Sequence, residues 1–234
     1  MNSDKMTARI VGVLFITATV APILTAPFIG FLGGGILGEP IPDYLVNVSA
    51  NEMQVYIGML IELIWALAVV GIPVMLFRIL KKHSEALSLG FFGLRSIEAL
   101  CTIVGSIILL TLLTLSQEFV KAGVPDVSYF QTLGTLLLAA REWTFMIGSG
   151  LVWSLSALIL NHILYRSKLI PRWLSGWGLV GATLSFATYL LQFLSINLDI
   201  LFLPIALQEM VFAVWLIVKG FNSSAIASGS AKTR

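Results

Sequence analysis

The chain has 234 residues, of which 58% are hydrophobic and 11% charged, whereas soluble domains carry roughly 45–50% apolar and ~25% charged residues. A soluble fold of this length could not bury so much apolar surface, because much of a small domain faces water. The formal net charge of +2 is spread over short segments, which excludes the dense basic surface of a nucleic-acid-binding protein. The composition therefore predicts an integral membrane protein whose surroundings are the lipid bilayer.

Six long apolar segments follow one another along the chain. Each could form a helix across ~30 Å of hydrocarbon, which takes about 20 residues, and each is too long for a barrel strand of ~9–11 residues. Pro22, Pro73 and Pro204 fall within these segments and predict kinks. We predict an all-α bundle of six transmembrane helices at about 10–32, 54–77, 87–115, 133–164, 173–196 and 200–219.

The first segment superficially resembles a signal peptide, because Lys5 and Arg9 precede an apolar run. That run, 10–32, is longer than the usual apolar region of about 7–15 residues in a signal peptide. We therefore expect the segment to be retained as the first membrane span.

The chain shows no domain boundary, and we predict a single transmembrane domain over residues 1–221. The first connection, 33–53, contains three consecutive glycines and two prolines and is expected to be a flexible loop. The segment 222–234 is rich in serine, alanine and glycine, and we expect it to be a disordered cytoplasmic tail.

Lysine and arginine residues predict the orientation of the spans. With the N-terminus inside, eleven lysine and arginine residues fall on inner segments, and Lys121 alone falls on an outer one. Because basic residues are enriched in cytoplasmic loops, this distribution predicts that both termini lie in the cytoplasm. We expect the protein in the plasma membrane.

The sequence carries no convincing catalytic or metal-binding motif. Residues 176–181 match the glycine spacing of dinucleotide sites, but they open a membrane helix, so close helix packing explains them better. Cys101 is the only cysteine, and His83 and His162 are the only histidines. No cofactor, metal ligand set or catalytic residue is therefore predicted.

Six charged side chains fall inside the predicted spans, where each costs about 2.5–3.5 kcal/mol at mid-span on insertion scales. They should therefore face protein or water and have partners. Arg95 and Glu98 are three residues apart and share a helix face. Arg141 is expected to pair with a carboxylate of another helix. The candidate ligand-binding or ionic core consists of Glu62, Arg95, Glu98, Arg141, Glu142 and Glu209.

The depths of these residues suggest that they converge. Glu62, Arg141 and Glu209 lie about eight or nine residues from the outer ends of their spans, roughly 12–14 Å at the helical rise. Glu62 and Glu209 are therefore the candidate partners of Arg141. Four glutamates and two arginines in one layer sum to 2 − 4 = −2. Either a glutamate is protonated or the layer holds a cation.

A set of motifs along the chain matches a known family. It consists of segments 7–15, 138–143, 165–167, 170–175 and 215–221, the acidic second span around Glu62, Arg95-x-x-Glu98, and Pro204-x-x-x-Gln208-Glu209-Met210. In these residues the chain resembles a family of bacterial multi-pass membrane proteins known as domain of unknown function 4386. The resemblance implies a multi-pass fold, and it implies no catalytic role for any residue.

Three functions remain open. The first is a transporter-like or sensor-like protein whose central acidic cavity binds a proton, a cation or a cationic small molecule. The second is an intramembrane enzyme acting on a lipid or isoprenoid, with glutamates as general acid and base. The third is a structural or interaction protein in which buried ion pairs only fix the helix packing.

Overall fold

The computed structural model describes residues 3–30, 43–122 and 127–231. Every regular element within these residues is a helix, and no β-strand occurs among them. Six helical segments are long and apolar enough to cross a membrane. The protein is a multi-pass membrane protein, and the predicted all-α class with six spans is confirmed.

The six spans agree with the predicted apolar segments to within a few residues at most ends. The fourth span is continuous through three elements, namely α5, the π-helix η2 and α6. The sixth begins with the short 3-10 helix η3. The bounds are α1 (Ser3–Ile29), α3 (Glu52–Leu80), α4 (Glu85–Ala122), α5 (Val127–Thr144), η2 (Phe145–Val152), α6 (Trp153–Ser167), α7 (Arg172–Gln192), η3 (Asp199–Phe202) and α8 (Leu203–Val218).

The prolines have two different roles. Pro22 and Pro73 lie inside α1 and α3, as predicted. Pro204, in contrast, is the second residue of α8, where the missing N–H of proline has no helical partner to lose. The predicted kink at Pro204 is therefore wrong, and this proline helps to start a helix.

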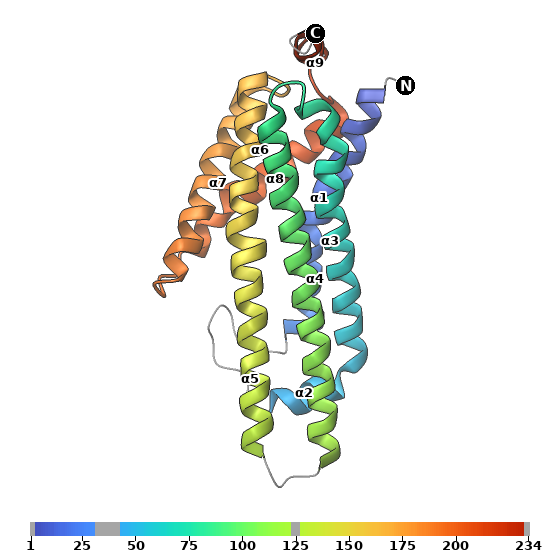
Figure 1. Cartoon of the computed structure of the whole chain (residues 1–234), viewed down its shortest axis with the longest axis vertical. Coiled ribbons are helices and arrows are strands. Elements are labelled where there is room, and N and C mark those ends of the chain that lie inside the picture. The colour runs from blue at the N-terminus through green and yellow to red at the C-terminus, as the bar shows by residue number, and fades with distance from the viewer. Residues whose placement is uncertain (1–2, 31–42, 123–126, 232–234) are drawn as a thin grey trace.

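The packing of the helices shows that the spans form a ring in the order of the sequence, and Figure 1 shows the bundle from the side. Along the chain, α1 packs on α3, α3 on α4, α4 on the α5–η2–α6 span, α6 on α7, and α7 on α8. Extensive packing of α8 on α1 closes the ring. The first and last spans are thus neighbours, and both termini lie at the same end of the bundle.

Two apolar clusters close the bundle towards its ends. The larger joins residues such as Phe15, Leu76 and Phe91 at the end that holds the termini. The smaller lies towards the opposite end and includes Val55 and Leu109. Packing and polar contacts hold membrane helices together, because lipid tails are as apolar as leucine. The residues between the clusters therefore occupy the middle of the bundle.

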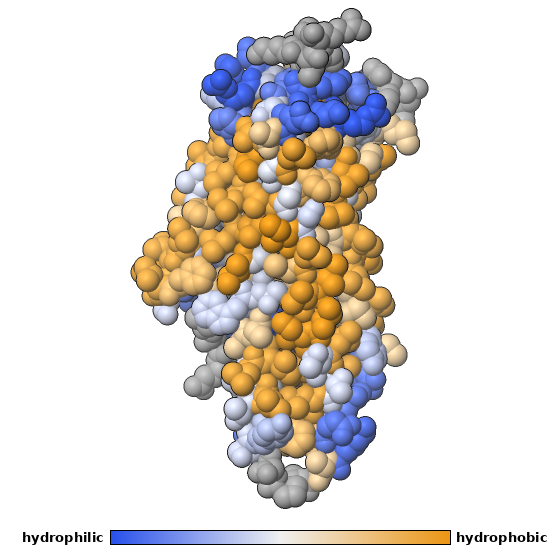
Figure 2. Space-filling view, in the orientation of Figure 1, coloured by the Kyte–Doolittle hydropathy of each residue, from blue (hydrophilic) through white to orange (hydrophobic). Residues whose placement is uncertain are grey.

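The outer surface suits a bilayer (Figure 2). A broad hydrophobic band covers the middle of the visible face, and hydrophilic residues cover the end that holds the termini. Large apolar side chains such as Leu67, Leu194 and Val218 are about 70% exposed. These side chains would contact lipid in a membrane.

Two connecting segments contain helices that the sequence analysis did not predict. Within the loop expected at 33–53, α2 (Tyr44–Ala50) packs on α4 and buries Tyr44 and Val48. The glycines and prolines of this loop lie outside the described residues. In the tail expected to be disordered, Ser223–Ala231 forms α9. Ala225 and Ile226 anchor α9 in the larger apolar cluster, which is the physical reason for the difference.

Candidate functional site

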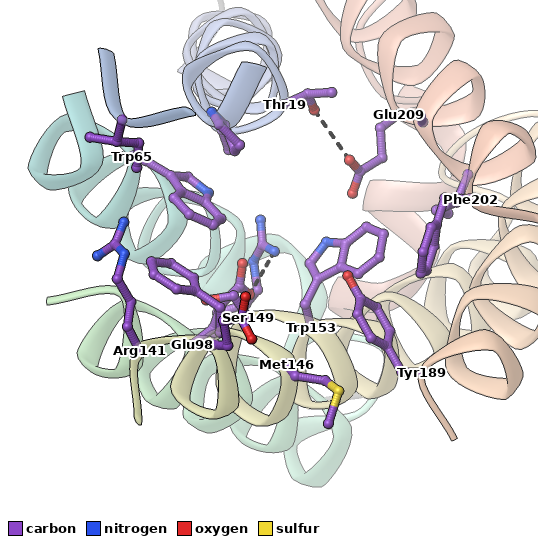
Figure 3. A pocket seen from close by; sticks show the side chains of 18 of the residues that line it. Thr19, Trp65, Glu98, Arg141, Met146, Ser149, Trp153, Tyr189, Phe202 and Glu209 are labelled. Carbon is purple, nitrogen blue, oxygen red and sulfur yellow. Dashed lines mark hydrogen bonds and ion pairs between the residues drawn. The ribbon is translucent and has the colours of Figure 1, made fainter. Parts of the chain in front are cut away.

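A cavity of about 540 Å³ lies inside the ring of spans. It lies between the two apolar clusters: on α3, for example, Trp65 faces the cavity, while Val55 and Ile72 belong to cores on either side of it. Every span contributes to the wall. The lining includes five charged side chains, namely Arg95, Glu98, Arg141, Glu142 and Glu209, and five aromatic ones, namely Trp65, Phe145, Trp153, Tyr189 and Phe202 (Figure 3).

Arg141 joins three spans. Its Nη2 forms an ion pair with Glu62 Oε1 of α3, and its Nη1 donates a 2.6 Å hydrogen bond to the carbonyl oxygen of Gly105 on α4. Ser106 Oγ donates a 2.7 Å hydrogen bond to the second Glu62 oxygen. Of the two carboxylates expected as partners of Arg141, Glu62 is the one that pairs with it. The Arg141 guanidinium and the Glu62 carboxylate therefore each have a second hydrogen-bond partner besides each other.

A glycine makes this arrangement possible. A Cβ atom on Gly105 would lie 2.7 Å from the Phe145 ring, closer than side chains approach. Gly105 thus leaves space for the Phe145 ring, and its carbonyl accepts the hydrogen bond from Arg141. The guanidinium of Arg141 also lies 4.7 Å from the centre of the Phe145 ring, a favourable cation–π distance.

Arg95 and Glu98 form the second ion pair. Arg95 Nη1 donates to Glu98 Oε2 at 2.9 Å, along the shared face of α4 that the three-residue spacing predicts. Both side chains are at least 97% buried. Arg95 Nε is also buried and has no hydrogen-bond partner among the described residues. This pair is therefore local to one helix and less fully bonded than the pair of Arg141.

Glu209 lies at the same end of the cavity as Arg95 but is held differently. Its Oε2 accepts a 3.2 Å hydrogen bond from Thr19 Oγ1, which joins α8 to α1 (Figure 3). Arg95 attracts the Glu209 carboxylate, the indole of Trp153 interacts favourably with it, and Glu98 repels it. Within the described chain, Glu209 forms no ion pair. The Arg95 guanidinium thus attracts the carboxylates of both Glu98 and Glu209.

The charges occupy two levels rather than the single layer that the sequence analysis expected. On α4, Glu98 belongs to one group, and Gly105, the partner of Arg141, belongs to the other. Seven residues separate them, or about 10 Å at the helical rise. The depth estimate failed because it assumed helices of similar length and tilt, whereas α4 has 38 residues and α8 has 16.

Glu142 also lines the cavity, and its side chain is partly exposed. It follows Arg141 directly, so the two side chains point in different directions from α5. Of the six predicted residues, five line the cavity, and Glu62 lies behind Arg141.

The π-helix η2 shapes the wall on this side. Phe145, Met146 and Ser149 of η2 line the cavity, and Ser149 Oγ lies 3.2 Å from Thr102 Oγ1 of α4. Gly150 leaves room for Tyr189, whose ring would lie 2.5 Å from a Cβ at that position. π-helical turns are rare and frequently occur at functional sites.

The sequence analysis missed the aromatic part of the cavity. Trp65 and Phe145 stack with ring centres 5.9 Å apart, and Tyr189 and Phe202 lie 4.8 Å apart. Nothing in the sequence distinguishes these rings from the aromatic residues that face lipid. The described residues contain no cluster of three or more histidine, cysteine, aspartate or glutamate side chains placed to hold a metal ion.

The family model described as domain of unknown function, DUF4386, matches residues 10–220. The chain belongs to the DUF4386 family. This assignment confirms the resemblance seen in the sequence, and the match extends through all six spans of this DUF4386 protein. No curated protein and no solved structure matches the chain.

Proposed function

We propose that this DUF4386 protein binds a cationic small molecule in its intramembrane cavity, as a transporter or a sensor does. The observation that carries the proposal is the charge of the cavity region. Four glutamates and two arginines gather there and sum to 2 − 4 = −2. Both arginines form their ion pairs with Glu98 and Glu62, so neither forms an ion pair with Glu209.

Uncompensated carboxylates are costly inside a bilayer, at about 2.5 kcal/mol or more each. Two events can remove the cost, namely protonation of a carboxyl group or binding of a cation. Both change the charge of the same cavity, and a cation and a proton would therefore compete for it. Such competition is what a proton-coupled transporter or a cation sensor requires.

The size and walls of the cavity favour an organic cation. Sites for small molecules commonly enclose about 300–1,000 Å³, and the cavity holds about 540 Å³. Aromatic rings attract cations through their π faces, and five such rings line the space. A compact inorganic ion would leave most of these apolar walls without contact.

We further propose that the protein lies in the plasma membrane of a bacterium with both termini in the cytoplasm. In this orientation eleven lysine and arginine residues fall on cytoplasmic segments and only Lys121 falls on an outer one, as is usual for membrane proteins. The basic segments lie at the end of the bundle that holds the termini, where the surface is strongly hydrophilic (Figure 2).

The purely structural alternative also has support, because the two buried ion pairs could serve only to fix the helix packing. Binding of tetraphenylphosphonium to the protein in lipid nanodiscs distinguishes the two functions. Tetraphenylborate has a similar shape and the opposite charge, so it is the matched control, and empty nanodiscs correct for partition into lipid.

We expect saturable binding of the phosphonium, accompanied by a change in tryptophan fluorescence because Trp65 and Trp153 line the cavity. We expect no saturable binding of the borate. Failure of the phosphonium to bind above the level of empty nanodiscs would overturn the proposal in favour of a structural ionic core.

A further inference from the structure

One end of the cavity combines a carboxylate with three aromatic rings. Glu209 points into the cavity from α8, and the side chains of Trp153, Tyr189 and Phe202 lie around it (Figure 3). These four side chains, called the Glu209 subsite below, come from α6, α7, η3 and α8. The subsite exists only because the fourth, fifth and sixth spans meet in the ring.

Glu209 differs in its bonding from the two ion-paired glutamates, Glu62 and Glu98. Glu62 is fixed by Arg141 and Ser106, and the Glu98 carboxylate accepts a hydrogen bond from Arg95. Glu209 accepts a hydrogen bond from the neutral hydroxyl of Thr19, interacts with the neutral indole of Trp153, and forms no ion pair within the described chain. Of these three carboxylates, Glu209 is therefore the one whose charge a ligand can neutralise with the least rearrangement.

The local charge fits a monovalent cation. Arg95, Glu98 and Glu209 sum to 1 − 2 = −1, and Arg95 interacts electrostatically with both carboxylates. At the other level, Arg141 and Glu62 neutralise each other. One positive charge at the Glu209 subsite would therefore balance this group of side chains.

The aromatic walls select the type of cation. A primary ammonium group needs partners for three N–H donors, and burial without them is costly. The acceptors of the subsite are the Glu209 carboxylate and the Thr19 and Tyr189 hydroxyls, whereas most of the surface of Trp153, Tyr189 and Phe202 is aromatic carbon. An alkylated ammonium has few N–H groups or none, and aromatic side chains recognise such cations in proteins.

We propose that the Glu209 subsite binds the tertiary or quaternary ammonium head of an amphipathic organic cation. The apolar body of the ligand extends along the cavity towards the stacked rings of Trp65 and Phe145, which line the same space. This assignment rests on the proposed function, since it specifies the ligand and its orientation in the same cavity.

Benzyltrimethylammonium and neopentylbenzene test the assignment, because the two molecules share a shape and differ in charge. The measurement is displacement of tetraphenylphosphonium from the protein in nanodiscs. We expect the ammonium to displace the probe and the neutral hydrocarbon to fail. We also expect benzylamine, a primary amine, to compete at least severalfold more weakly than benzyltrimethylammonium.

Four substitutions test the position of the head group. Glu209→Gln should weaken binding of benzyltrimethylammonium about tenfold or more, and Phe202→Leu about threefold to tenfold, in the range of one cation–π contact. Glu142→Gln is the matched comparison, since it removes a carboxylate from the same cavity outside the subsite, and it should weaken binding less than Glu209→Gln does. Glu209→Asp keeps the charge and should retain more binding than Glu209→Gln, and melting curves check that each variant is folded.

The outcomes separate the subsite from the general function. If wild-type protein binds tetraphenylphosphonium but benzyltrimethylammonium does not compete, the ammonium assignment is wrong and cation binding stands. If Glu142→Gln abolishes binding and Glu209→Gln does not, the head group lies at the other end of the cavity. If wild-type protein binds neither cation, the proposed function itself fails.

Discussion

The two charged groups of the cavity are built in opposite ways. The Arg141 group joins α3, α4 and α5, and its guanidinium bonds both a carboxylate and a backbone carbonyl. The Arg95 group has its ion pair within α4 and leaves Arg95 Nε without a hydrogen-bond partner among the described residues. It includes Glu209, which is held by the neutral Thr19 hydroxyl and Trp153 indole rather than by an ion pair. The first group is saturated with bonds, whereas the second has fewer cationic partners than carboxylates.

This difference suggests a division of roles. A saturated group between helices is suited to fixing their packing, because any displacement would leave a charge uncompensated in a medium of low polarity. A group with an excess carboxylate facing a cavity is suited to exchanging protons or cations. The Arg141 group should therefore determine stability, and the Glu209 subsite should determine binding.

The largest expected effect is loss of stability on breaking the Arg141 group. Arg141→Met leaves Glu62 buried without its partner and should lower the free energy of unfolding by about 3–5 kcal/mol. Adding Glu62→Gln should recover much of the loss, because it removes the uncompensated charge. Melting curves of the two single variants and the double variant measure the coupling. Additive effects would show that the ion pair does not stabilise the packing.

A smaller loss is expected for Arg95→Gln. Removal of one hydrogen bond to a charged group costs about 1.5–3 kcal/mol, and the cavity beside Glu98 and Glu209 allows a bound cation to replace the lost charge. The same change makes the local charge more negative and should strengthen binding of tetraphenylphosphonium by about tenfold. Unchanged or weaker binding in a folded variant would contradict the role assigned to this group.

Chemical modification should distinguish the two groups without affecting the fold. A hydrophobic carbodiimide reacts with protonated carboxyl groups, so we expect it to modify Glu209 faster at low pH and to leave Glu62, which is ion-paired with Arg141, unmodified. Tetraphenylphosphonium should protect Glu209. Mass spectrometry of peptides identifies the modified residue. Preferential modification of Glu62 would reverse the proposed division of roles.

The smallest effect on stability is expected from single cysteines that report orientation. The Glu209 subsite lies nearer the basic end of the bundle. Glu209 is ten residues from Lys219, and Arg141 is 25 residues from Arg166, which correspond to about 15 Å and about 38 Å along a helix. In a Cys101→Ala background, cysteines at Ser84 and Ser167 should react with an impermeant reagent only from the cytoplasm, and one at Ser128 only from outside. Labelling at Ser167 in intact cells would place the subsite near the outer face instead.

Several structural features could be predicted because they depend on neighbouring residues. Long apolar runs identified all six spans, since a helix must satisfy its own backbone hydrogen bonds in lipid. The spacing of Arg95 and Glu98 predicted their shared face for the same local reason. The six charged residues within the spans stood out because charged residues are rare in apolar segments.

Other features depend on how distant segments pack, and the sequence left them open. Arg141 pairs with Glu62 rather than with Glu209 because of the relative heights of α3, α5 and α8 in the bundle. Counting residues from the ends of the spans did not predict these heights correctly. The π-helix at 145–152 accompanies close packing of its glycines against Cys101 and Tyr189. Helix α9 is anchored by burial of Ala225 and Ile226 in a core formed by other helices.

The number of membrane spans and the excess of carboxylates within them could be read from the residues alone, because hydrophobicity and charge are properties of each residue. Which carboxylate pairs with Arg141 and which one lies among the aromatic rings depend on distances between side chains of different helices. Arg141 of α5 reaches Glu62 of α3, and the closure of α8 on α1 brings Glu209 to Thr19.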